Sequence, residues 1–323
     1  GASGILISLG MLAYSLAPTY GVLLLALAFL GIGGGVVEAL INPLVQELHP
    51  DDSGRYLNIT NAFWSVGVLC TMLLTGDLLA RGVSWRVIMA GVAGLSLVSG
   101  VLFLVLREVG PRREKVAMGT VFAAKKAILA SGGFWVFSIL MFFAGAAEGS
   151  MTYWTASFIQ LHHGGDPRAA GVGAALFAAG MILGRLVFGW WIPQRKLYSL
   201  ILWTAILGIG FSLWLPFVRT IPVAYGALFL IGISVACFWP SIQSYSVDRL
   251  GFDPTALFIL LSIGGIAGFA SVSFFMGWLA DRVGLRGSFF VVPLFFAGLA
   301  GVLAWERADR PQSNRSDGSV RSV

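Results

Sequence analysis

Ten long apolar segments set the strongest constraint on how this chain can fold. Most of them approach or exceed the roughly 20 apolar residues that an α-helix needs to cross a lipid bilayer. The mean hydropathy is +0.86 and charged residues make up 11% of the sequence, whereas soluble domains contain about a quarter. Backbone groups inside a bilayer must pair within their own segment, so these segments are predicted to be helices. The expected spans are 2–17, 21–45, 57–80, 85–106, 131–160, 168–192, 197–217, 221–246, 255–280 and 286–305.

Lysine and arginine residues are concentrated in alternate loops. If residue 1 enters the membrane from the cytoplasm, most of these cations lie in the inner loops and the tail, as the positive-inside rule requires. The longest polar connection, 107–130, is predicted to be a cytoplasmic central loop. It separates an N-terminal half, 1–106, from a C-terminal six-helix half, 131–306, and residues 307–323 are predicted to be a disordered cytoplasmic tail. A multi-pass protein of the inner cell membrane with a cytoplasmic C-terminus is expected.

The two halves resemble each other at an offset of about 200 residues. The sequence SVG at 65–67 matches SIG at 262–264, and FL at 29–30 matches FL at 229–230. On this alignment the spans within 131–192 have no counterpart upstream. The repeat therefore predicts an all-α architecture of two six-helix halves, of which ten helices lie in this sequence and two would precede it. Parallel six-helix repeats with a solute site between them, near the membrane midplane, describe a known transporter architecture.

Glu38 lies in the middle of the otherwise apolar or small-residue run 21–45. An ionisable group near the centre of a span costs about 3 kcal/mol on insertion scales, so it usually faces a partner or a water-filled cavity. Burial also favours the protonated form of a carboxyl group. Glu38 is therefore predicted to be a proton-coupling site, and the alternative is a structural glutamate bonded to a neighbouring helix. Asn42 lies at i+4 on the same helix face and is predicted to bind substrate.

Three stretches carry a resemblance to a known family. The sequence GIGGGVVEALINPLVQELHPDDSGRYLNITNAFWSVG, 31–67, resembles the fourth and fifth helices of the fucose permease branch of the major facilitator superfamily, which comprises proton-coupled sugar symporters. The stretch GAAEGSMTYWTASF, 145–158, is similar to the seventh helix of that branch, in which a glutamate precedes a tryptophan. GMILGRLVFGW, 180–190, has a common eighth-helix pattern. The resemblance implies symport of a sugar with a proton by alternating access.

Further polar residues within the spans are predicted to bind the substrate. Glu148 and Thr152 share a helix face, and a carboxylate can accept hydrogen bonds from sugar hydroxyls. Trp154 can stack on the C–H face of a sugar, and the alternative is an aromatic residue at the membrane interface. Asn61 offers a donor and an acceptor without the cost of a charge, and the alternative is a hydrogen bond between helices.

Two residues are predicted to act in gating or in structure. Arg185 lies within a span, where it is expected to form a latch with carboxylates or carbonyls, and direct substrate contact is the alternative. Pro240 is predicted to kink or break its helix because it removes an i→i−4 hydrogen bond. Gln243 follows and is a predicted substrate ligand, since broken helices often line transport sites. A kink that serves packing alone is the alternative.

Other functional classes find less support in the residues. An intramembrane protease needs a base within a span, and the three histidines, His49, His162 and His163, all fall in loops. Both cysteines fall in apolar spans, where they are expected to be buried, and indicate neither a disulfide nor a metal site. No enzyme activity, cofactor or metal is therefore predicted. The expected partners are a sugar-like polar solute, H⁺ and the lipid bilayer, with no nucleic acid, and the chain is expected to be a monomer.

Two rival functions remain compatible with the same helices, because a fold does not fix a function. One is a proton-driven efflux antiporter for drugs or metabolites, which a hydrophobic, aromatic cavity would favour. The other is a receptor derived from a transporter, which would bind a solute without accumulating it.

Overall fold

The computed structural model describes residues 1–106 and 125–308. These residues form α-helices that are joined by short turns. The α-helices are α1 (Ala2–Leu16), α2 (Tyr20–Leu48), α3 (Ser53–Ala80), α4 (Trp85–Val105), α6 (Gly132–Ser157), α7 (Pro167–Trp191), α8 (Leu197–Trp214), α9 (Ile221–Val235), α10 (Phe238–Leu250), α11 (Pro254–Ser288) and α12 (Val292–Ala308). Short helical turns are η1 (Pro50–Asp52), the π-helical η2 (Phe158–His162), η3 (Gln194–Lys196), η4 (Leu215–Phe217) and η5 (Phe289–Val291).

The all-α membrane class predicted from the sequence is confirmed. Within 1–106 and 125–308, eight helical stretches are long and apolar enough to cross a membrane. One of these stretches contains both α11 and α12, and the shorter apolar helix α1 is additional. α11 itself bends at Gly284, whose φ of 78° is open to glycine but strained for other residues. The ten predicted spans therefore all correspond to helices.

Three features differ in detail from the expected spans. The span predicted at 221–246 is divided between α9 and α10. In the expected central loop, 107–124 lie outside the described residues, and 125–130 are helical. The expected tail begins later, because α12 continues to Ala308, and 309–323 lie outside the described residues.

Two helices begin at an Asp-Pro pair. Asp166 and Asp253 are the N-cap residues of α7 and α11, and each carboxylate accepts a hydrogen bond from a backbone N–H, at 2.7 Å from Ala169 and 2.9 Å from Ala256. The proline that follows each aspartate occupies the first helical position, where its missing N–H has no intrahelical partner to lose. Local chemistry thus fixes where these two helices start.

Small residues let the helices of the C-terminal half approach closely. A Cβ atom at Gly268 of α11 would lie 2.0 Å from the carbonyl oxygen of Phe142 in α6, and one at Gly180 of α7 would lie 2.1 Å from that of Phe229 in α9. No side chain fits at these distances. Membrane helices gain little from the hydrophobic effect between themselves, so such backbone contacts supply much of their packing energy.

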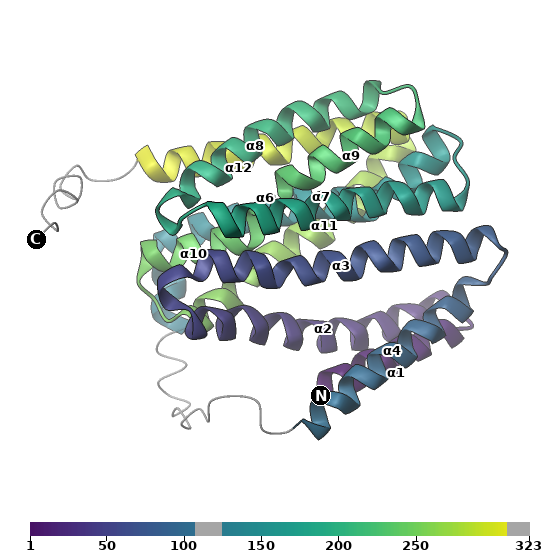
Figure 1. Cartoon of the computed structure of the whole chain (residues 1–323), viewed down its shortest axis with the longest axis horizontal. Coiled ribbons are helices and arrows are strands. Elements are labelled where there is room, and N and C mark those ends of the chain that lie inside the picture. Colours follow the sequence, from purple (N-terminus) through teal and green to yellow (C-terminus); the bar gives the residue numbers. More distant parts are fainter. Residues whose placement is uncertain (107–124, 309–323) are drawn as a thin grey trace, which may run out of the picture.

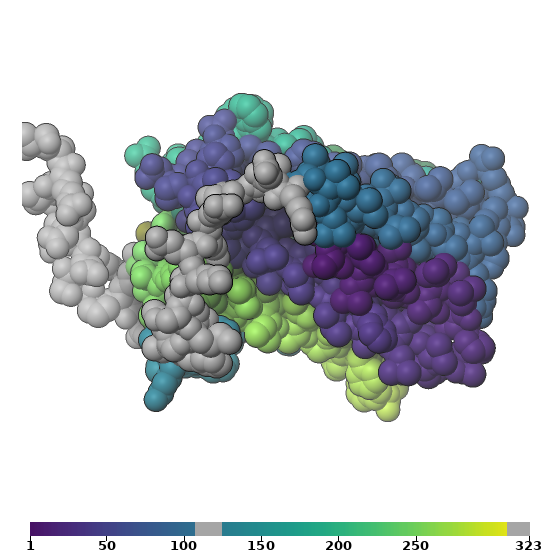
Figure 2. All heavy atoms as spheres, turned by 90° about the horizontal axis from the view of Figure 1, so that it is seen from below, coloured from purple at the N-terminus to yellow at the C-terminus, as the bar shows by residue number. Residues whose placement is uncertain are grey.

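The helices form two groups that meet along a long interface (Figure 1). α1 packs against α2 and α4, α6 packs against α11 and α12, and α7 packs against α9. Between the groups, α3 lies along α7 in the most extensive helix contact, and α2 meets α11. Figure 2 shows a face on which atoms of residues 1–106, in purple and blue, lie beside green atoms of the C-terminal group. Large exposed apolar side chains on α2 and α4, such as Phe29 and Phe103, suit contact with lipid.

Candidate functional site

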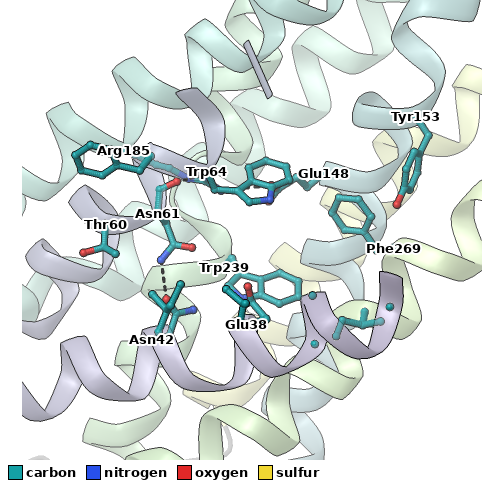
Figure 3. A pocket seen from close by; sticks show the side chains of 17 residues that line it. Glu38, Asn42, Thr60, Asn61, Trp64, Glu148, Tyr153, Arg185, Trp239 and Phe269 are labelled. Atoms are coloured by element: carbon teal, nitrogen blue, oxygen red, sulfur yellow. Dashed lines mark hydrogen bonds and ion pairs between the residues drawn. The ribbon is translucent and has the colours of Figure 1, made fainter. Parts of the chain in front are cut away.

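A cavity of about 750 Å³ lies between the two groups of helices. It is walled by α2 and α3 on one side and by α6, α7, α10 and α11 on the other (Figure 3). Five of its side chains are aromatic, and three are ionisable at ordinary pH. The lining residues are Gly31, Gly34, Gly35, Val37, Glu38, Ile41, Asn42, Thr60, Asn61, Phe63, Trp64, Glu148, Tyr153, Arg185, Trp239, Ile266 and Phe269.

Glu38 faces this cavity from the middle of α2. Its Oε1 atom is buried and has no hydrogen-bond partner. The indole of Trp239 lies within reach of the carboxyl group, yet the Trp239 Nε1 atom also completes no hydrogen bond of normal geometry. Arg185 is close enough to attract Glu38 electrostatically. Glu38 thus lies in a membrane helix without the hydrogen-bonded partner that a purely structural carboxylate requires.

Arg185 and Glu148 form a buried ion pair beside Glu38. The Arg185 Nη2 atom lies 3.3 Å from the Glu148 Oε1 atom, and the two residues are only 2% and 4% exposed. Arg185 also donates from Nη1 to the Asn61 carbonyl oxygen at 2.8 Å and to the Ser65 Oγ atom at 2.6 Å. The guanidinium group therefore connects α7 with α6 and α3 at once, which suits its planar array of donors.

The helix break near Pro240 supplies another acceptor for Arg185. Because Pro240 has no N–H, it cannot donate to the Ala236 carbonyl oxygen four residues earlier. That oxygen accepts a hydrogen bond of 3.0 Å from the Arg185 Nε atom instead. α9 ends at Val235, a two-residue turn follows at 236–237, and α10 begins at Phe238. The turn lies just before Pro240, which is in the first turn of α10, where a missing N–H has no intrahelical partner to lose. A gating role for Pro240 stays a prediction.

A chain of amides runs from α3 across to α11 at one end of the cavity. The Asn61 Nδ2 atom donates to the Asn42 Oδ1 atom at 3.0 Å, and the Asn42 Nδ2 atom donates to the Gln243 Oε1 atom at 2.9 Å. Gln243 in turn donates to the Ser262 Oγ atom at 3.2 Å. Asn42 and Asn61 line the cavity, whereas Gln243 is fully buried behind them.

Further hydrogen bonds join the two groups of helices in the region between the cavity and the α2–α3 connection. These bonds and the Asn42–Gln243 bond together are called the seam. The Ser53 and Ser244 Oγ atoms are 2.8 Å apart, and the Asn58 Nδ2 atom donates to the Ser241 Oγ atom at 3.1 Å. Gln194, in η3, accepts from the Gly54 N–H at 3.1 Å. The seam closes the cavity at this end, since along α2, α3 and α10 it occupies the turns next to the cavity residues.

The remaining predicted ligands lie away from the cavity lining. The Thr152 hydroxyl donates to the Glu148 carbonyl oxygen at 2.9 Å. Trp154 packs against Gly277 of α11, and its Nε1 atom is buried without a partner. Its neighbour Tyr153 faces the cavity instead. Thus Glu38, Asn42, Asn61, Glu148 and Arg185 are brought together, while Thr152, Trp154 and Gln243 are not part of the lining.

Sequence reasoning missed four aromatic residues of the cavity: Trp64, Tyr153, Trp239 and Phe269. The Arg185 guanidinium carbon lies 5.5 Å from the centre of the Trp64 ring, within the range of a cation–π contact. The position of Trp239 could have indicated a place in the cavity, because it directly precedes Pro240, where the sequence predicts a broken helix. The other three could not be told from lipid-facing aromatics, which are common in any span.

The described residues hold no cluster of three or more metal-ligating side chains. Cys237 is fully buried, as expected, whereas Cys70 is exposed on α3. The expectation of burial was therefore wrong for Cys70, because α3 turns that face away from its neighbours.

Comparisons with known proteins agree with this geometry. A family model described as Major Facilitator Superfamily matches residues 1–270. An uncharacterized transporter, y4wD of Sinorhizobium fredii, is 25% identical over 301 residues, which cover 90% of this chain and 76% of that protein.

Solved structures of transporters share the fold. A variant of the Escherichia coli fucose:proton symporter FucP superposes with a TM-score of 0.72 at 17% identity, covering 94% of this chain and 82% of that one. The human organic anion transporter MFSD10 superposes with a TM-score of 0.71 at 14% identity, covering 94% and 75%. These likenesses concern the fold alone.

Proposed function

The chain belongs to the major facilitator superfamily of membrane transporters, and we propose that it is a proton-coupled symporter for a sugar or a similar polar solute. The observation that carries the proposal is Glu38, a carboxyl group that faces the cavity from within a membrane helix and has no hydrogen-bond partner on Oε1. An intramembrane carboxyl group of this kind is typical of proton relays. The shared fold with a fucose:proton symporter supports the same reading.

The charges around the cavity favour a proton on Glu38. The described lining contains two carboxyl groups, Glu38 and Glu148, and one cation, Arg185. Since Arg185 is paired with Glu148, an ionised Glu38 leaves one uncompensated negative charge in a low-dielectric setting, which is costly. A proton taken up by Glu38 removes that charge. Uptake of a proton and binding of the solute in the adjacent space would then occur together.

Polar and aromatic groups in the lining suit a ring-shaped polar solute. Asn42, Asn61 and Glu148 offer hydrogen-bond donors and acceptors, and Trp64 and Trp239 offer flat faces for C–H groups. We assign substrate contact first to these cavity-lining residues. Thr152, Trp154 and Gln243 would then act by supporting them, because their side chains lie behind the lining.

A second candidate function is proton-driven efflux of an amphipathic solute. It is favoured by the aromatic share of the lining, which includes Phe63, Tyr153 and Phe269 beside the two tryptophans. The two functions differ in the direction of solute movement and in the substrate: symport carries protons and a polar solute inward together, whereas efflux exports an amphipathic solute in exchange for protons.

The proposed orientation places the α2–α3 connection in the cytoplasm, in agreement with the positive-inside distribution of lysine and arginine. The seam then closes the cytoplasmic side of the cavity, and the C-terminus is cytoplasmic.

The test measures proton movement with the complete coding sequence in energy-depleted cells. We expect external alkalinisation on addition of one member of a panel of hexoses, pentoses and polyols. Glu38→Gln should abolish the alkalinisation and uphill accumulation but leave counterflow exchange of the same solute. Glu47→Gln, which changes the other acidic residue of α2, should retain both activities. Full accumulation by Glu38→Gln would refute the coupling role, and drug extrusion without any sugar response would favour efflux.

A further inference from the structure

Trp239 is the one cavity residue of α10, and its indole lies beside the Glu38 carboxyl group of α2. The two side chains come from different helix groups and lie within hydrogen-bonding reach of each other. Both the Trp239 Nε1 atom and the Glu38 Oε1 atom are buried, and neither completes a hydrogen bond of normal geometry, with each other or with any other group. An indole can only donate and an ionised carboxylate can only accept, so the strength of this contact depends on whether Glu38 carries a proton.

α10 is a short helix that a turn at 236–237, called the hinge below, separates from α9. The backbone angles of this turn stay in the right-handed helical region, but the Ala236 N–H donates to the Ile233 carbonyl oxygen, three residues earlier, and so departs from the α-helical pattern. The carbonyl oxygen of Ala236, within the hinge, accepts a hydrogen bond from Arg185 rather than from α10. Trp239 is the second residue of α10. A contact that its side chain gains or loses therefore changes the forces on α10 next to the hinge.

α10 also carries most of the seam on the C-terminal side. Ser241, Gln243 and Ser244 bond to Asn58, Asn42 and Ser53, respectively. Gln194 links the same helix to α3, because its Nε2 atom donates to the Ser244 Oγ atom at 2.7 Å and to the Asp248 Oδ2 atom at 2.8 Å. Any displacement of α10 relative to α2 and α3 therefore breaks the seam.

We propose that Trp239 couples the protonation of Glu38 to the opening of the seam. When Glu38 is ionised, its carboxylate attracts the Trp239 N–H and holds α10 against α2, and the seam is closed. When Glu38 is protonated, the attraction weakens and α10 is released at its hinge. In this scheme Trp239 positions α10 through its indole N–H, and this role is separate from any contact that its ring face makes with the solute. The proposal rests on Glu38 being the proton site.

Other titratable groups near Glu38 are few. Arg185 of α7, Glu148 of α6 and Tyr153 of α6 line the same cavity, and the cavity residues of α3 and α11 carry no ionisable side chain. Arg185 and Glu148 form an ion pair with each other. His163, in the turn after η2, does not line the cavity. Burial, and next the charge of His162, lower the pKa of its imidazole.

The test follows the seam directly and needs no known solute. Spin labels are placed at Asp51→Cys in η1 and Arg195→Cys in η3, two exposed residues on opposite sides of the seam, with Cys70 replaced by serine and buried Cys237 retained. The distance distribution is measured by electron–electron double resonance in lipid nanodiscs between pH 5 and pH 9. A charge-assisted hydrogen bond exceeds a neutral one by about a factor of five to ten in equilibrium constant. We therefore expect the ratio of closed to open populations to fall by about that factor as pH is lowered.

Variants separate the inference from the function on which it rests. Trp239→Phe removes the N–H but keeps an aromatic ring, and its distance distribution should not change with pH; Trp239→Met serves the same purpose if the first variant fails to fold. Trp154→Phe is the matched control, since it removes another buried, unpartnered indole N–H, on α6 beside Gly277, and it should respond like the native protein.

Three results would overturn the scheme in distinguishable ways. A native protein whose seam does not respond to pH contradicts the inference directly. A Glu38→Gln variant that keeps the response shows that another group titrates, which removes the proposed proton site as well. A response lost in Glu38→Gln but kept in Trp239→Phe refutes the role of Trp239 and leaves Glu38 as the proton site.

Discussion

Replacing Arg185 by glutamine should destabilise the protein more than any other single change to a charged residue of the described helices. The guanidinium group makes four hydrogen-bonded or ionic contacts, to Glu148, Asn61, Ser65 and Ala236, from a position that is 2% exposed. Glutamine has two N–H donors and no charge, so it can serve at most two of these acceptors. Glu148, which is 4% exposed, would be left as a buried carboxylate without a counterion.

The expected cost is about 3 to 5 kcal/mol, the usual penalty for removing one partner of a buried ion pair. Total stabilities of folded proteins are only about 5 to 15 kcal/mol, so the loss would be visible as a large drop in folded yield. Much of this cost comes from the stranded charge of Glu148 rather than from lost bonding. The double variant Arg185→Gln/Glu148→Gln should therefore be more stable than Arg185→Gln alone.

Thermal stability can be followed by size-exclusion chromatography of a fluorescent fusion after heating in detergent. Arg282→Gln is the matched control: Arg282 donates to the Trp278 carbonyl oxygen at 3.1 Å but is exposed, and its loss should cost less than about 1 kcal/mol. Two outcomes would refute the reasoning. One is equal stability of the Arg185 and Arg282 variants, and the other is a double variant less stable than Arg185→Gln.

Three further predictions follow from other parts of the molecule. Gly268→Val should prevent α6 from packing on α11 and abolish folding, because its Cβ atom would lie 2.0 Å from the Phe142 carbonyl oxygen. Gly226→Val, which has open space around its Cβ position, should fold. The yield of folded protein after membrane extraction distinguishes the two variants. Gln194→Ala should weaken the seam, because Gly54 and Ser244 lose a shared hydrogen-bond partner. A cysteine introduced into the cavity should then react faster with a thiol reagent from the cytoplasmic side. An unchanged labelling rate would contradict a closing role for Gln194. Asp51→Cys should react with an impermeant thiol reagent only in inverted vesicles and Arg219→Cys only in intact cells, and the opposite result would reverse the proposed orientation.

The sequence was sufficient to predict the helices but not their contacts. Spans were recognisable because the bilayer demands about 20 apolar residues each, and a polar residue inside such a span was visible as an exception. Glu38, Asn42 and Arg185 were found in this way, and all three line one cavity. The pairing of Arg185 with Glu148 was not foreseeable, because helix periodicity gives the face of a residue but not the helix that it meets.

Trp154 and Tyr153 also show that the sequence does not determine which of two neighbouring aromatic side chains faces the cavity. The sequence predicts Trp154 as a substrate ligand because an indole can stack on a sugar, yet the side chain packs on Gly277 and its neighbour Tyr153 lines the cavity. Adjacent residues on a helix point about 100° apart, so a small error in the assumed rotation exchanges one for the other. Polar residues are less ambiguous, since their burial cost restricts the faces that they can occupy.

The contacts of Arg185 bear on which helix pair moves when the cavity opens to the other side. α3 and α7 touch at three levels: Gly171 meets Met72 at one end, Arg185 meets Ser65 in the middle, and Gly189 meets Arg55 at the other end. Breaking all three levels together would expose a buried charge, which is far more costly than separating the neutral hydrogen bonds of the seam. We therefore expect the α3–α7 pair to act as the pivot, with Arg185 holding it, while α10 and α2 separate. In that arrangement Arg185 stays in place at the pivot, whereas its position in the sequence suggests a latch that opens. The helix that moves is α10, whose Trp239 lies beside Glu38 of α2.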